Sequence, residues 1–377
     1  MDPLSASRRI IHNLTDYRTQ RARLLAAVEH KKGVLHTWQH PLCGPAGEAL
    51  FTDLAVIGNP HASRVMLIIS GTHGVEGYYG SDNQIEWLNS LDAARLPAEC
   101  AVMLIHLLNP WGAAHLRRVN EENIDLNRNF IPFSAPLPDN ADYARYHAFY
   151  HGERAEADRL LAAALQRDGW PAIKRVVEAG QYQHADGLFY GGKHATWSQQ
   201  TLQKIVTGHL LRAEQILSFD LHTGAGAWGH PMLLGIAQKQ VPVHARGREL
   251  YGEWLTLIDT GSGQESATGI TATATGYVSQ FLLDQLPHGA ILPLVVECGT
   301  YAGEEMHRRV RDDHWLHLEG DVQSAAGQAL KQQLVEGFWP QDRDWRELTA
   351  FRTQQIFRRG WQALLSQPAV KRHAGGL

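Results

Sequence analysis

Short apolar runs that alternate with helical patterns constrain the fold of this chain more than any other feature of its sequence. Seven runs are β-branched or rich in leucine and end in Gly, Pro or Asn, which is typical of buried strands. They span residues 33–38, 50–58, 64–70, 101–108, 216–222, 231–237 and 291–297. Helical patterns separate most of them, at residues 83–94, 143–168, 200–212 and 244–258. The alternation predicts an α/β fold with a mixed, mostly parallel central sheet flanked by helices, and the first two runs predict an antiparallel hairpin at its edge.

We expect one domain over residues 1–377. The 377 residues would suffice for two average domains, but no repeat, low-complexity block or Pro/Gly/Ser-rich linker divides them. Residues 134–212 lie between two motif-bearing segments and have a mainly helical pattern. We interpret them as an insertion that covers one end of the sheet. Residues 319–377 carry two further helical patterns, which we expect to pack on the outside.

Composition argues against several classes of protein. A net charge of −4, without any run of five like charges, speaks against a nucleic-acid partner. No stretch approaches the roughly 18 apolar residues of a membrane span, and the first residues contain no apolar secretion segment. The three cysteines form no C-x-x-C pair, so neither a disulfide framework nor a thiolate zinc site is expected. These features predict a cytoplasmic protein without a membrane partner.

Four stretches of unusual composition fall at the ends of predicted strands. They are GTHGVEG (71–77), NPWGAAHLRRVNEENIDLNRNF (109–130), FDLHTGAG (219–226) and VVECGTY (295–301). Ligands of α/β sheets bind beyond the carboxyl ends of the strands. The chemistry of the chain is therefore expected at this edge of the sheet.

The first stretch holds His73 and Glu76 in a turn whose glycines permit tight backbone geometry. An imidazole and a carboxylate are two of the three ligands of a His₂Glu catalytic zinc site. A short H-x-x-E spacing is common, and by itself it more often marks a glycine-rich turn with an exposed histidine and glutamate.

His222 closes an apolar strand, where an imidazole has no use unless it coordinates or hydrogen-bonds something. Asp220 lies two residues earlier, on the same strand face, and is placed to hold the ring. The alternative is a core histidine beside a capping aspartate. Together with His73 and Glu76, His222 completes a three-ligand zinc set with the fourth position open to water.

Glu297 ends a strand that is apolar throughout, and a carboxylate there is costly to desolvate without a partner. With a raised pKa, and next to a zinc ion, it would take a proton from the bound water and pass it to a leaving amine. The alternative is a glutamate that is exposed where the strand emerges, or one that is paired with an arginine.

The stretch 109–130 is rich in arginine and asparagine: Arg117, Arg118, Asn120, Asn123, Asn127, Arg128 and Asn129. Arginine holds a carboxylate through two parallel N–H···O bonds, and asparagine adds further donors. One arginine could instead stabilise the oxyanion that forms when water attacks a carbonyl. We expect Arg117 to be a salt-bridged residue of a surface loop.

Jointly, the four stretches resemble the zinc metallocarboxypeptidase superfamily, which includes carboxypeptidase A-like peptidases, murein-peptide amidases and the succinylglutamate desuccinylase/aspartoacylase branch. The form SGTHGVEGYYGS, with GLFYGGKHATWS (187–198), is closer still to a bacterial branch of largely uncharacterised members. The resemblance covers roughly residues 50–305. It implies a single metallocarboxypeptidase-like catalytic domain with a carboxypeptidase-like fold and one Zn²⁺ per chain.

The resemblance also implies a role for each matching residue. Zn²⁺ binds to His73, Glu76 and His222. Glu297 is the general acid and base, and Arg118 polarises the scissile carbonyl. Asn127 and Arg128 hold the terminal carboxylate of the substrate, and Asp125 orients His73.

Two features depart from the pattern of the superfamily. The tyrosine that closes over substrate is assigned to Tyr277, with Tyr301 as its competitor. A glycine that is common before the I/V-D-L-N-R core is Asn123 here, which leaves the local turn open. We further consider Gln280, Asp284 and residues 187–197 as wall elements of the substrate pocket, although each is as readily structural.

The resemblance implies a zinc-dependent hydrolase that cleaves an amide bond next to a free carboxylate, with a small molecule or a peptide as substrate. A carboxypeptidase-type metallopeptidase is favoured because only 80 residues follow Glu297 and their patterns are helical, whereas the desuccinylase branch appends a β-rich domain. The alternative is an N-acyl amino acid deacylase. A non-catalytic carboxylate-binding protein of the same fold would be expected to lack a ligand or the base, and this chain lacks neither.

Overall fold

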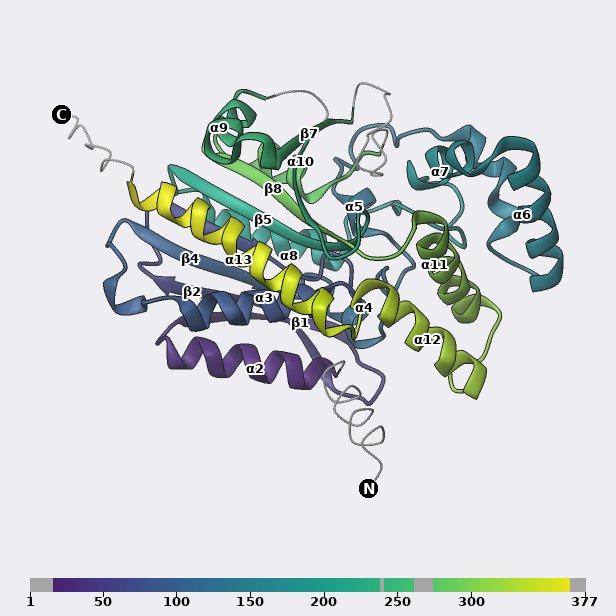
Figure 1. Ribbon diagram of the computed structural model, residues 1–377, viewed down its shortest axis with the longest axis horizontal. Coiled ribbons are helices and arrows are strands. Elements are labelled where there is room, and N and C mark those ends of the chain that lie inside the picture. The colour runs from purple at the N-terminus through teal and green to yellow at the C-terminus, as the bar shows by residue number, and fades with distance from the viewer. Residues whose placement is uncertain (1–15, 238–240, 261–273, 367–377) are drawn as a thin grey trace.

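The central sheet has eight strands in the order β1-β2-β4-β3-β5-β8-β6-β7 (Figure 1). The computed structural model describes residues 16–237, 241–260 and 274–366. The strands are β1 (Val34–Cys43), β2 (Ala49–Gly58), β3 (Arg64–Ile69), β4 (Cys100–His106), β5 (Gln215–Gly224), β6 (Pro231–Ala237), β7 (Leu255–Asp259) and β8 (Ile291–Gly299). The four central strands β4, β3, β5 and β8 are mutually parallel, whereas β2 and β6 pair antiparallel to their inner neighbours. The predicted mixed, mostly parallel sheet is confirmed.

All seven predicted runs lie in strands, and the first two form the predicted antiparallel hairpin at the edge of the sheet. Every residue of β3 and of β4 is buried. Helices cover both faces of a parallel sheet, so its strands are apolar throughout rather than alternating. This is why the runs 64–70 and 101–108 are so uniformly hydrophobic.

One prediction of a helix was wrong at its end. The pattern at residues 244–258 is a helix only as far as α9 (Pro242–Tyr251), and residues 255–259 form the strand β7 at the sheet edge. The helix ends at Gly252, whose positive φ of 58° is one that glycine adopts readily. The apolar side chains of Leu255 and Ile258 are buried in the strand. They continue the helical spacing by chance.

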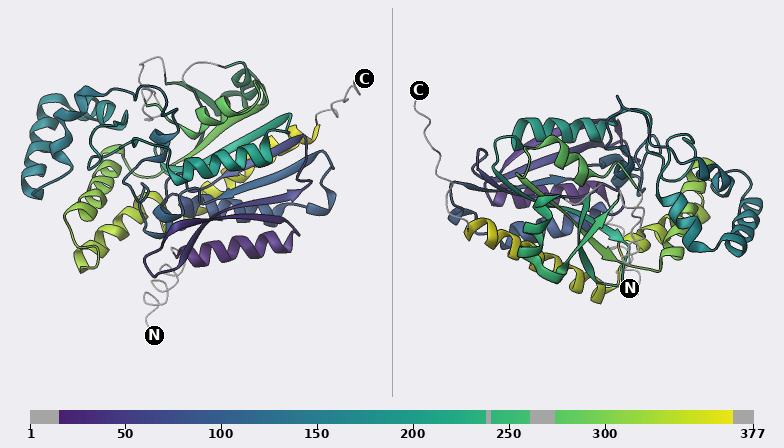
Figure 2. Two further views of the ribbon diagram at one scale, coloured as in Figure 1. Left: turned by 180° about the vertical axis from the view of Figure 1, so that it is seen from behind. Right: turned by 90° about the horizontal axis from the view of Figure 1, so that it is seen from above.

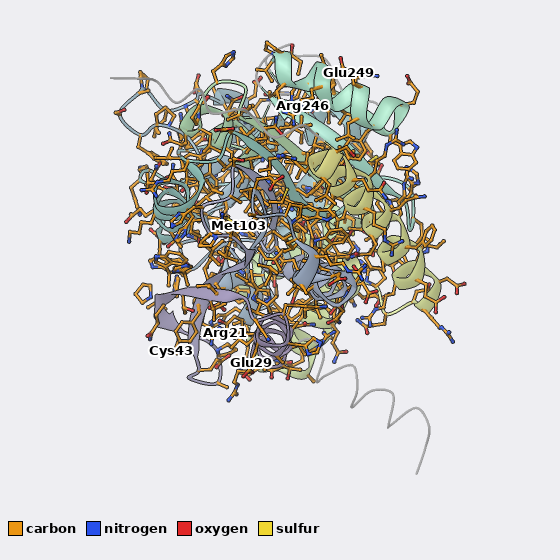
Figure 3. All side chains as sticks on the ribbon, turned by 90° about the vertical axis from the view of Figure 1, so that its left-hand side faces the viewer. Arg21, Glu29, Cys43, Met103, Arg246 and Glu249 are labelled. Atoms are coloured by element: carbon orange, nitrogen blue, oxygen red, sulfur yellow. The ribbon has the colours of Figure 1, made fainter. Side chains whose placement is uncertain are left out.

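Helices cover both faces of the sheet (Figure 2). Alternate residues of each central strand pack against one or the other of these two layers. Met66 and Ile68 of β3 belong to the core under α2 (Tyr17–His30), α3 (Gly77–Ser90), α9 and α13 (Arg343–Ser366). Val65 and Leu67 belong to the core under α8 (Trp197–Ile205) and α10 (Val278–Gln285). Met103 of β4 lies inside the molecule, whereas Arg246 and Glu249 of α9 lie at its periphery (Figure 3).

The segment 134–212 contributes to two places. Its first part holds short 3₁₀ turns at Ala141–Arg145 and His147–Phe149, then α6 (Arg154–Asp168) and α7 (Trp170–Glu178). These elements share a small aromatic core that packs against Val310 of α11 (Gly303–Leu318), to the side of the sheet in Figure 1. The helix predicted over 143–168 therefore begins only at Arg154. The last part, α8, covers a face of the sheet rather than its end.

The remaining helices are short or follow the sheet. They are a 3₁₀ turn at Ala93–Arg95, α4 (Pro110–Ala114), α5 (Leu126–Asn129), a π-type turn at Val206–Leu210, a 3₁₀ turn at Gly252–Trp254 and α12 (Ala325–Phe338). The chain after Glu297 is helical as far as Ser366, as the sequence predicts, and residues 367–377 lie outside the described part. None of the described helices combines the length and the apolar character that crossing a membrane requires.

Candidate metal centre and substrate cleft

The turn that links β3 to α3 is as tight as its glycines suggest. Gly71 has a φ of 68°, in the left-handed region. Gly74 lies so close to the short helix α4 that a Cβ there would overlap the backbone of Gly112 and Ala113. The turn is also tied to the arginine-rich loop, because the Val75 amide donates to the Arg117 carbonyl at 2.9 Å. The absence of a side chain at the glycines therefore lets the turn pack directly against the segment that contains Gly112 and Arg117.

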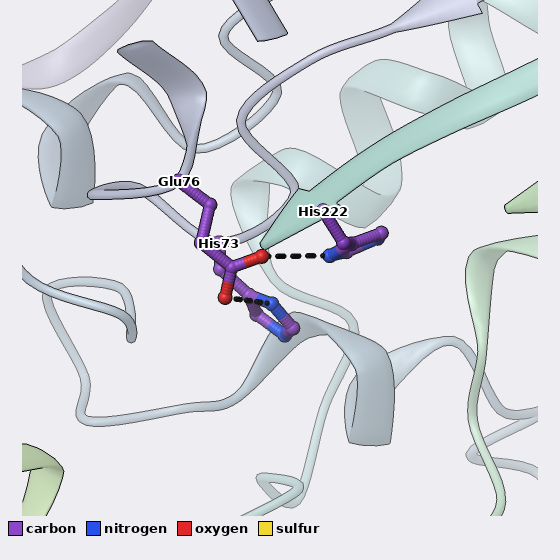
Figure 4. Close-up of side chains that lie close together, drawn as sticks. All are labelled: His73, Glu76 and His222. Carbon is purple, nitrogen blue, oxygen red and sulfur yellow. Dashed lines mark hydrogen bonds and ion pairs between the residues drawn. The ribbon is translucent and has the colours of Figure 1, made fainter. Parts of the chain in front are cut away.

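His73, Glu76 and His222 converge on one point (Figure 4). Nδ1 of His73 lies 3.0 Å from Oε1 of Glu76, and Nδ1 of His222 lies 3.0 Å from Oε2. All three side chains are buried, and their candidate ligand atoms lie within 4.8 Å of one another. One carboxylate thus stands between two imidazoles, of which one comes from the turn after β3 and the other from β5, more than 140 residues later.

The outer nitrogen of each imidazole is held by an aspartate. Nε2 of His73 lies 3.0 Å from Asp125, and Nε2 of His222 lies 2.9 Å from Asp220, whose other oxygen accepts from Thr72 at 2.8 Å. Without an ion, both Nδ1 atoms lie at hydrogen-bond distance from Glu76; with an ion bound, an aspartate that accepts the Nε2 proton would leave the Nδ1 lone pair to coordinate it. Metal-ligating histidines are oriented in this way. The donor set, two imidazoles and a carboxylate, fits a divalent ion such as zinc.

The charges in this cluster compensate one another. Burial opposes the ionisation of Glu76, but the charge of His73 and hydrogen bonds from both histidines outweigh it and hold the pKa of Glu76 well below its usual range. Burial likewise opposes the ionisation of Asp125, and Arg118 and His73 reverse it, so that the pKa of Asp125 is also lowered. The cluster is therefore anionic in its carboxylates at neutral pH, as a cation site requires.

Glu297 stands beside the three candidate ligands. It is the in-register partner of His222 across the parallel pair β5 and β8, so the two side chains share a face of the sheet. Its Oε1 accepts from the amide of Ala225 at 2.9 Å. Burial and the negative charge of Glu76 raise the pKa of Glu297 to about 7. A carboxyl group with such a pKa both accepts and returns a proton near neutral pH.

Arg118 bridges two carboxylates of the site. Its Nη1 donates to Glu76 at 2.9 Å and its Nε to Asp125 at 3.1 Å. These bonds use two of the five N–H donors of the guanidinium and fix its plane. Arg117, by contrast, is buried against Asp313 at 3.3 Å, so the expected salt bridge exists but not on the surface.

Asn127 and Arg128 also reach the cleft. Asn127 lies 3.4 Å from Nε2 of His222 through its amide nitrogen and accepts from the Val278 amide at 3.1 Å. The guanidinium of Arg128 stands between the rings of Phe189 and Tyr277, at 5.6 and 5.4 Å from their centroids. Its buried Nε has no hydrogen-bond partner among the residues that the structure describes, which is costly unless a ligand supplies an acceptor.

Asn123, where a glycine was expected, adopts a backbone conformation that favours glycine. Its φ of 59° lies in the left-handed region, which asparagine tolerates better than most residues. Its side-chain amide donates to the carbonyls of Ala185 and Gly187, at 2.9 and 3.0 Å. The asparagine thus keeps the turn and ties it to the segment 181–191.

One cavity of about 440 Å³ joins these groups. Eight of the residues predicted from sequence line it: His73, Glu76, Arg118, Asn127, Arg128, His222, Tyr277 and Glu297. Asp125 and Asp220 stand behind the two imidazoles. Tyr301 lines the cavity too, but its hydroxyl donates to Glu336 at 2.9 Å. Gln280 and Asp284 are not among the lining residues and bond to each other at 2.8 Å.

Further walls of the cavity were not predicted. Trp170, Lys174 and Glu178 come from α7, and Met306 and His307 from α11. Of the wall segment proposed from sequence, Phe189 lines the cavity, with a φ of 53° that is unusual for a bulky residue. No motif marks the helical residues, because only the packing of α7 on α11 brings them to the strand ends.

Comparison with solved structures places the fold. Thrombin activatable fibrinolysis inhibitor shares 10% identity with the chain, over 93% of this chain and 75% of its own, with a TM-score of 0.52. Carboxypeptidase A from Helicoverpa armigera shares 14% identity over 91% and 74%, with a TM-score of 0.45. A succinylglutamate desuccinylase from Silicibacter sp. TM1040 shares 12% over 81% and 66%, with a TM-score of 0.38. The likeness to thrombin activatable fibrinolysis inhibitor is one of fold, and the predicted carboxypeptidase-like α/β fold is confirmed.

No curated protein matches the chain. A family model does, over residues 14–352, and so spans the whole sheet and the cavity. The chain belongs to the family described as a protein of unknown function, DUF2817.

Proposed function

We propose that the protein is a zinc-dependent hydrolase that cleaves an amide bond next to a free carboxylate, as a carboxypeptidase-type metallopeptidase does. The observation that carries this proposal is the convergence of His73, Glu76 and His222, with both Nδ1 atoms facing the carboxylate, beside Glu297 in the same cavity. Zinc bound there would polarise the scissile carbonyl and lower the pKa of a bound water. The side chains around it supply the rest of the chemistry.

Glu297 is the proton carrier of the proposed reaction. As a carboxylate it takes the proton from the attacking water, and as the acid it returns that proton to the leaving amine. The N–H groups of Arg118 that do not bond to Glu76 and Asp125 donate to the oxyanion that develops on the carbonyl. The guanidinium is held in place by two carboxylates, so it need not reorganise during the reaction.

Arg128 and Asn127 bind the free carboxylate of the substrate in this proposal. The guanidinium is buried between Phe189 and Tyr277, and no acceptor for its Nε lies in the described part of the chain. A substrate carboxylate supplies one, and low local polarity strengthens the pair. Tyr277 is preferred over Tyr301 as the tyrosine that contacts substrate, because it lies against Arg128 and Tyr301 is engaged by Glu336.

An N-acyl amino acid is the second candidate substrate, because it presents an amide near a carboxylate to the same residues. The cavity walls from α7 favour a small molecule, since Trp170, Lys174 and Glu178 limit the space beside the strand ends. The helical chain after Glu297 favours the peptidase. The deacylase and the peptidase would both hydrolyse an amide bond next to a carboxylate.

The test combines metal content with turnover. Wild-type protein, His73→Ala and Arg128→Ala would be equilibrated with zinc, washed, and incubated with a mixed library of short peptides and N-acyl amino acids, and products would be identified by mass spectrometry. We expect carboxylate-adjacent amides to be cleaved by the wild type only. His73→Ala should lose zinc, whereas Arg128→Ala should keep it. A wild type that holds no zinc at the His73 site would contradict the proposal.

A further inference from the structure

A second group of candidate ligands lies outside the cavity, in the segment between β4 and α8. His147 and His151 are four residues apart at and after the 3₁₀ turn His147–Phe149, and Asp186 comes from the loop that leads to Phe189. Their candidate ligand atoms lie within 4.8 Å of one another. Nothing in the proposed reaction uses these side chains.

The nitrogens of this group are arranged like those at the first site. Nε2 of His147 lies 3.0 Å from Oδ1 of Asp186, so the carboxylate accepts the Nε2 proton and the Nδ1 lone pair faces away from it. Nδ1 in turn lies 3.2 Å from Nε2 of His151. Two nitrogens on a tetrahedral zinc ion, with bonds of about 2.0–2.1 Å, are about 3.3 Å apart. The two imidazoles already have the spacing of ligands on one ion.

A third histidine packs against His147. The ring of His184 stacks on that of His147, with centroids 4.0 Å apart. This packing restricts the rotation of the His147 ring.

We propose that His147 and His151, supported by Asp186, bind a second divalent metal ion of the class that imidazole prefers, with zinc as the ion to be tested. Entry is open, because the side chain of Asp186 is 54% exposed and that of His147 is 16% exposed. With two imidazoles and water as ligands, affinity should be lower than at the His73 site, where three protein ligands converge. The hydrogen bond between the two histidines is replaced by two bonds to the ion.

The position of this site suggests what the ion would do. Asp186 accepts from His314 of α11 through its backbone carbonyl, at 2.9 Å. The flanking carbonyls of Ala185 and Gly187 accept hydrogen bonds from the side chain of Asn123. Asn123 lies five residues from each of the two cleft arginines, Arg118 and Arg128. An ion at His147 would therefore fix the loop that carries Phe189 into the cavity. It would stabilise the wall of the cleft rather than take part in the chemistry.

The experiment counts zinc ions in the full chain. Wild-type protein, His147→Ala/His151→Ala, His73→Ala and the exposed control His288→Ala would be dialysed against a series of buffered free-zinc concentrations and measured by elemental mass spectrometry. We expect the wild type and the control to rise from one to two ions per chain. The double variant should stop at one and keep the tighter ion, and His73→Ala should keep only the weaker one.

A conservative variant guards against misfolding. Asp186→Asn keeps the shape of the side chain but loses the carboxylate that orients His147, so the second binding constant should fall about 10–100-fold while the first is unchanged. Circular dichroism would verify that all variants are folded. If the His147→Ala/His151→Ala variant still bound two ions, the proposed second site would be wrong. If that variant lost only the tighter ion, the assignment of the tighter ion to the His73 site would be wrong.

Discussion

At the scale of single residues, the register of two strands places Glu297 beside His222. The two residues are far apart in the sequence, yet the pairing of β5 with β8 places them directly opposite each other. Glu297→Gln keeps the shape and removes the base. We expect zinc content to stay the same and kcat to fall about 10²–10⁴-fold, the usual contribution of a positioned acid or base. Full activity of the glutamine variant, measured on a substrate identified from the library, would exclude Glu297 as the proton carrier.

We also expect Glu297 to set the acid limb of the pH profile of kcat/KM. The pKa of Glu297 is raised to about 7 by burial and by the charge of Glu76, and a bound cation would act in the opposite direction. Because the base must be ionised, kcat/KM should fall as the pH drops through a value at or below about 7. In Glu297→Gln the residual activity should lack this limb. An identical limb in the variant would assign the titration to another group.

Residue identities pointed to the candidate ligands, the candidate base and the two cleft arginines, because each chemistry needs a particular side chain, and the structure brings these residues together in one cavity. What the sequence could not show was their surroundings. Arg117 was expected on the surface and is buried against Asp313, since burial depends on α11, which lies about 190 residues away. Asn123 was an open question until its positive φ showed how it replaces glycine.

At the scale of elements, strands were predicted better than helix ends. A buried strand is a local apolar run, so all seven runs were found. The end of α9 depends instead on the conformation of Gly252, and β7 depends on its pairing with β6. The local spacing of apolar residues predicts neither. The walls of the cavity were missed for a related reason, because α7 faces the site only through its packing on α11.

The turn between β3 and α3 offers a test at this scale. Gly74→Ala would force a methyl group into the backbone of Gly112 and Ala113, and neither backbone can move cheaply. We expect the turn to shift and the zinc affinity of the His73 site to fall by at least tenfold, since ligand positions must hold within a fraction of an ångström. Gly208→Ala is the matched control, because nothing lies within 4 Å of its Cβ position. Zinc titration against a competing chelator measures both, and equal affinities would show that the close approach is unimportant.

At the scale of the whole molecule, buried neutral histidines link stability to pH. Burial lowers the pKa of His106, His307 and His314 to about 4 in the folded protein. His106 lies under α3, where its Nε2 lies 2.9 Å from Ser81, and the other two lie where α11 meets the segment 141–187. In the unfolded chain each titrates near 6.5. Acid should therefore weaken the sheet core and the cavity wall together.

The sign of this effect follows from proton binding. Between pH 6.5 and 4 the unfolded chain binds a proton at each histidine that the folded chain does not, so stability is complete above about 6.5 and is lost as the pH falls. Each histidine should cost about 1 kcal/mol between pH 7.5 and 5.5. Urea unfolding at both pH values, with zinc held constant, would measure the loss. His106→Gln removes one titration, so its loss over the same interval should be smaller by about 1 kcal/mol, whatever its stability at pH 7.5. If both proteins lost the same amount, His106 would have to be charged in the fold, contrary to its burial beside Ser81.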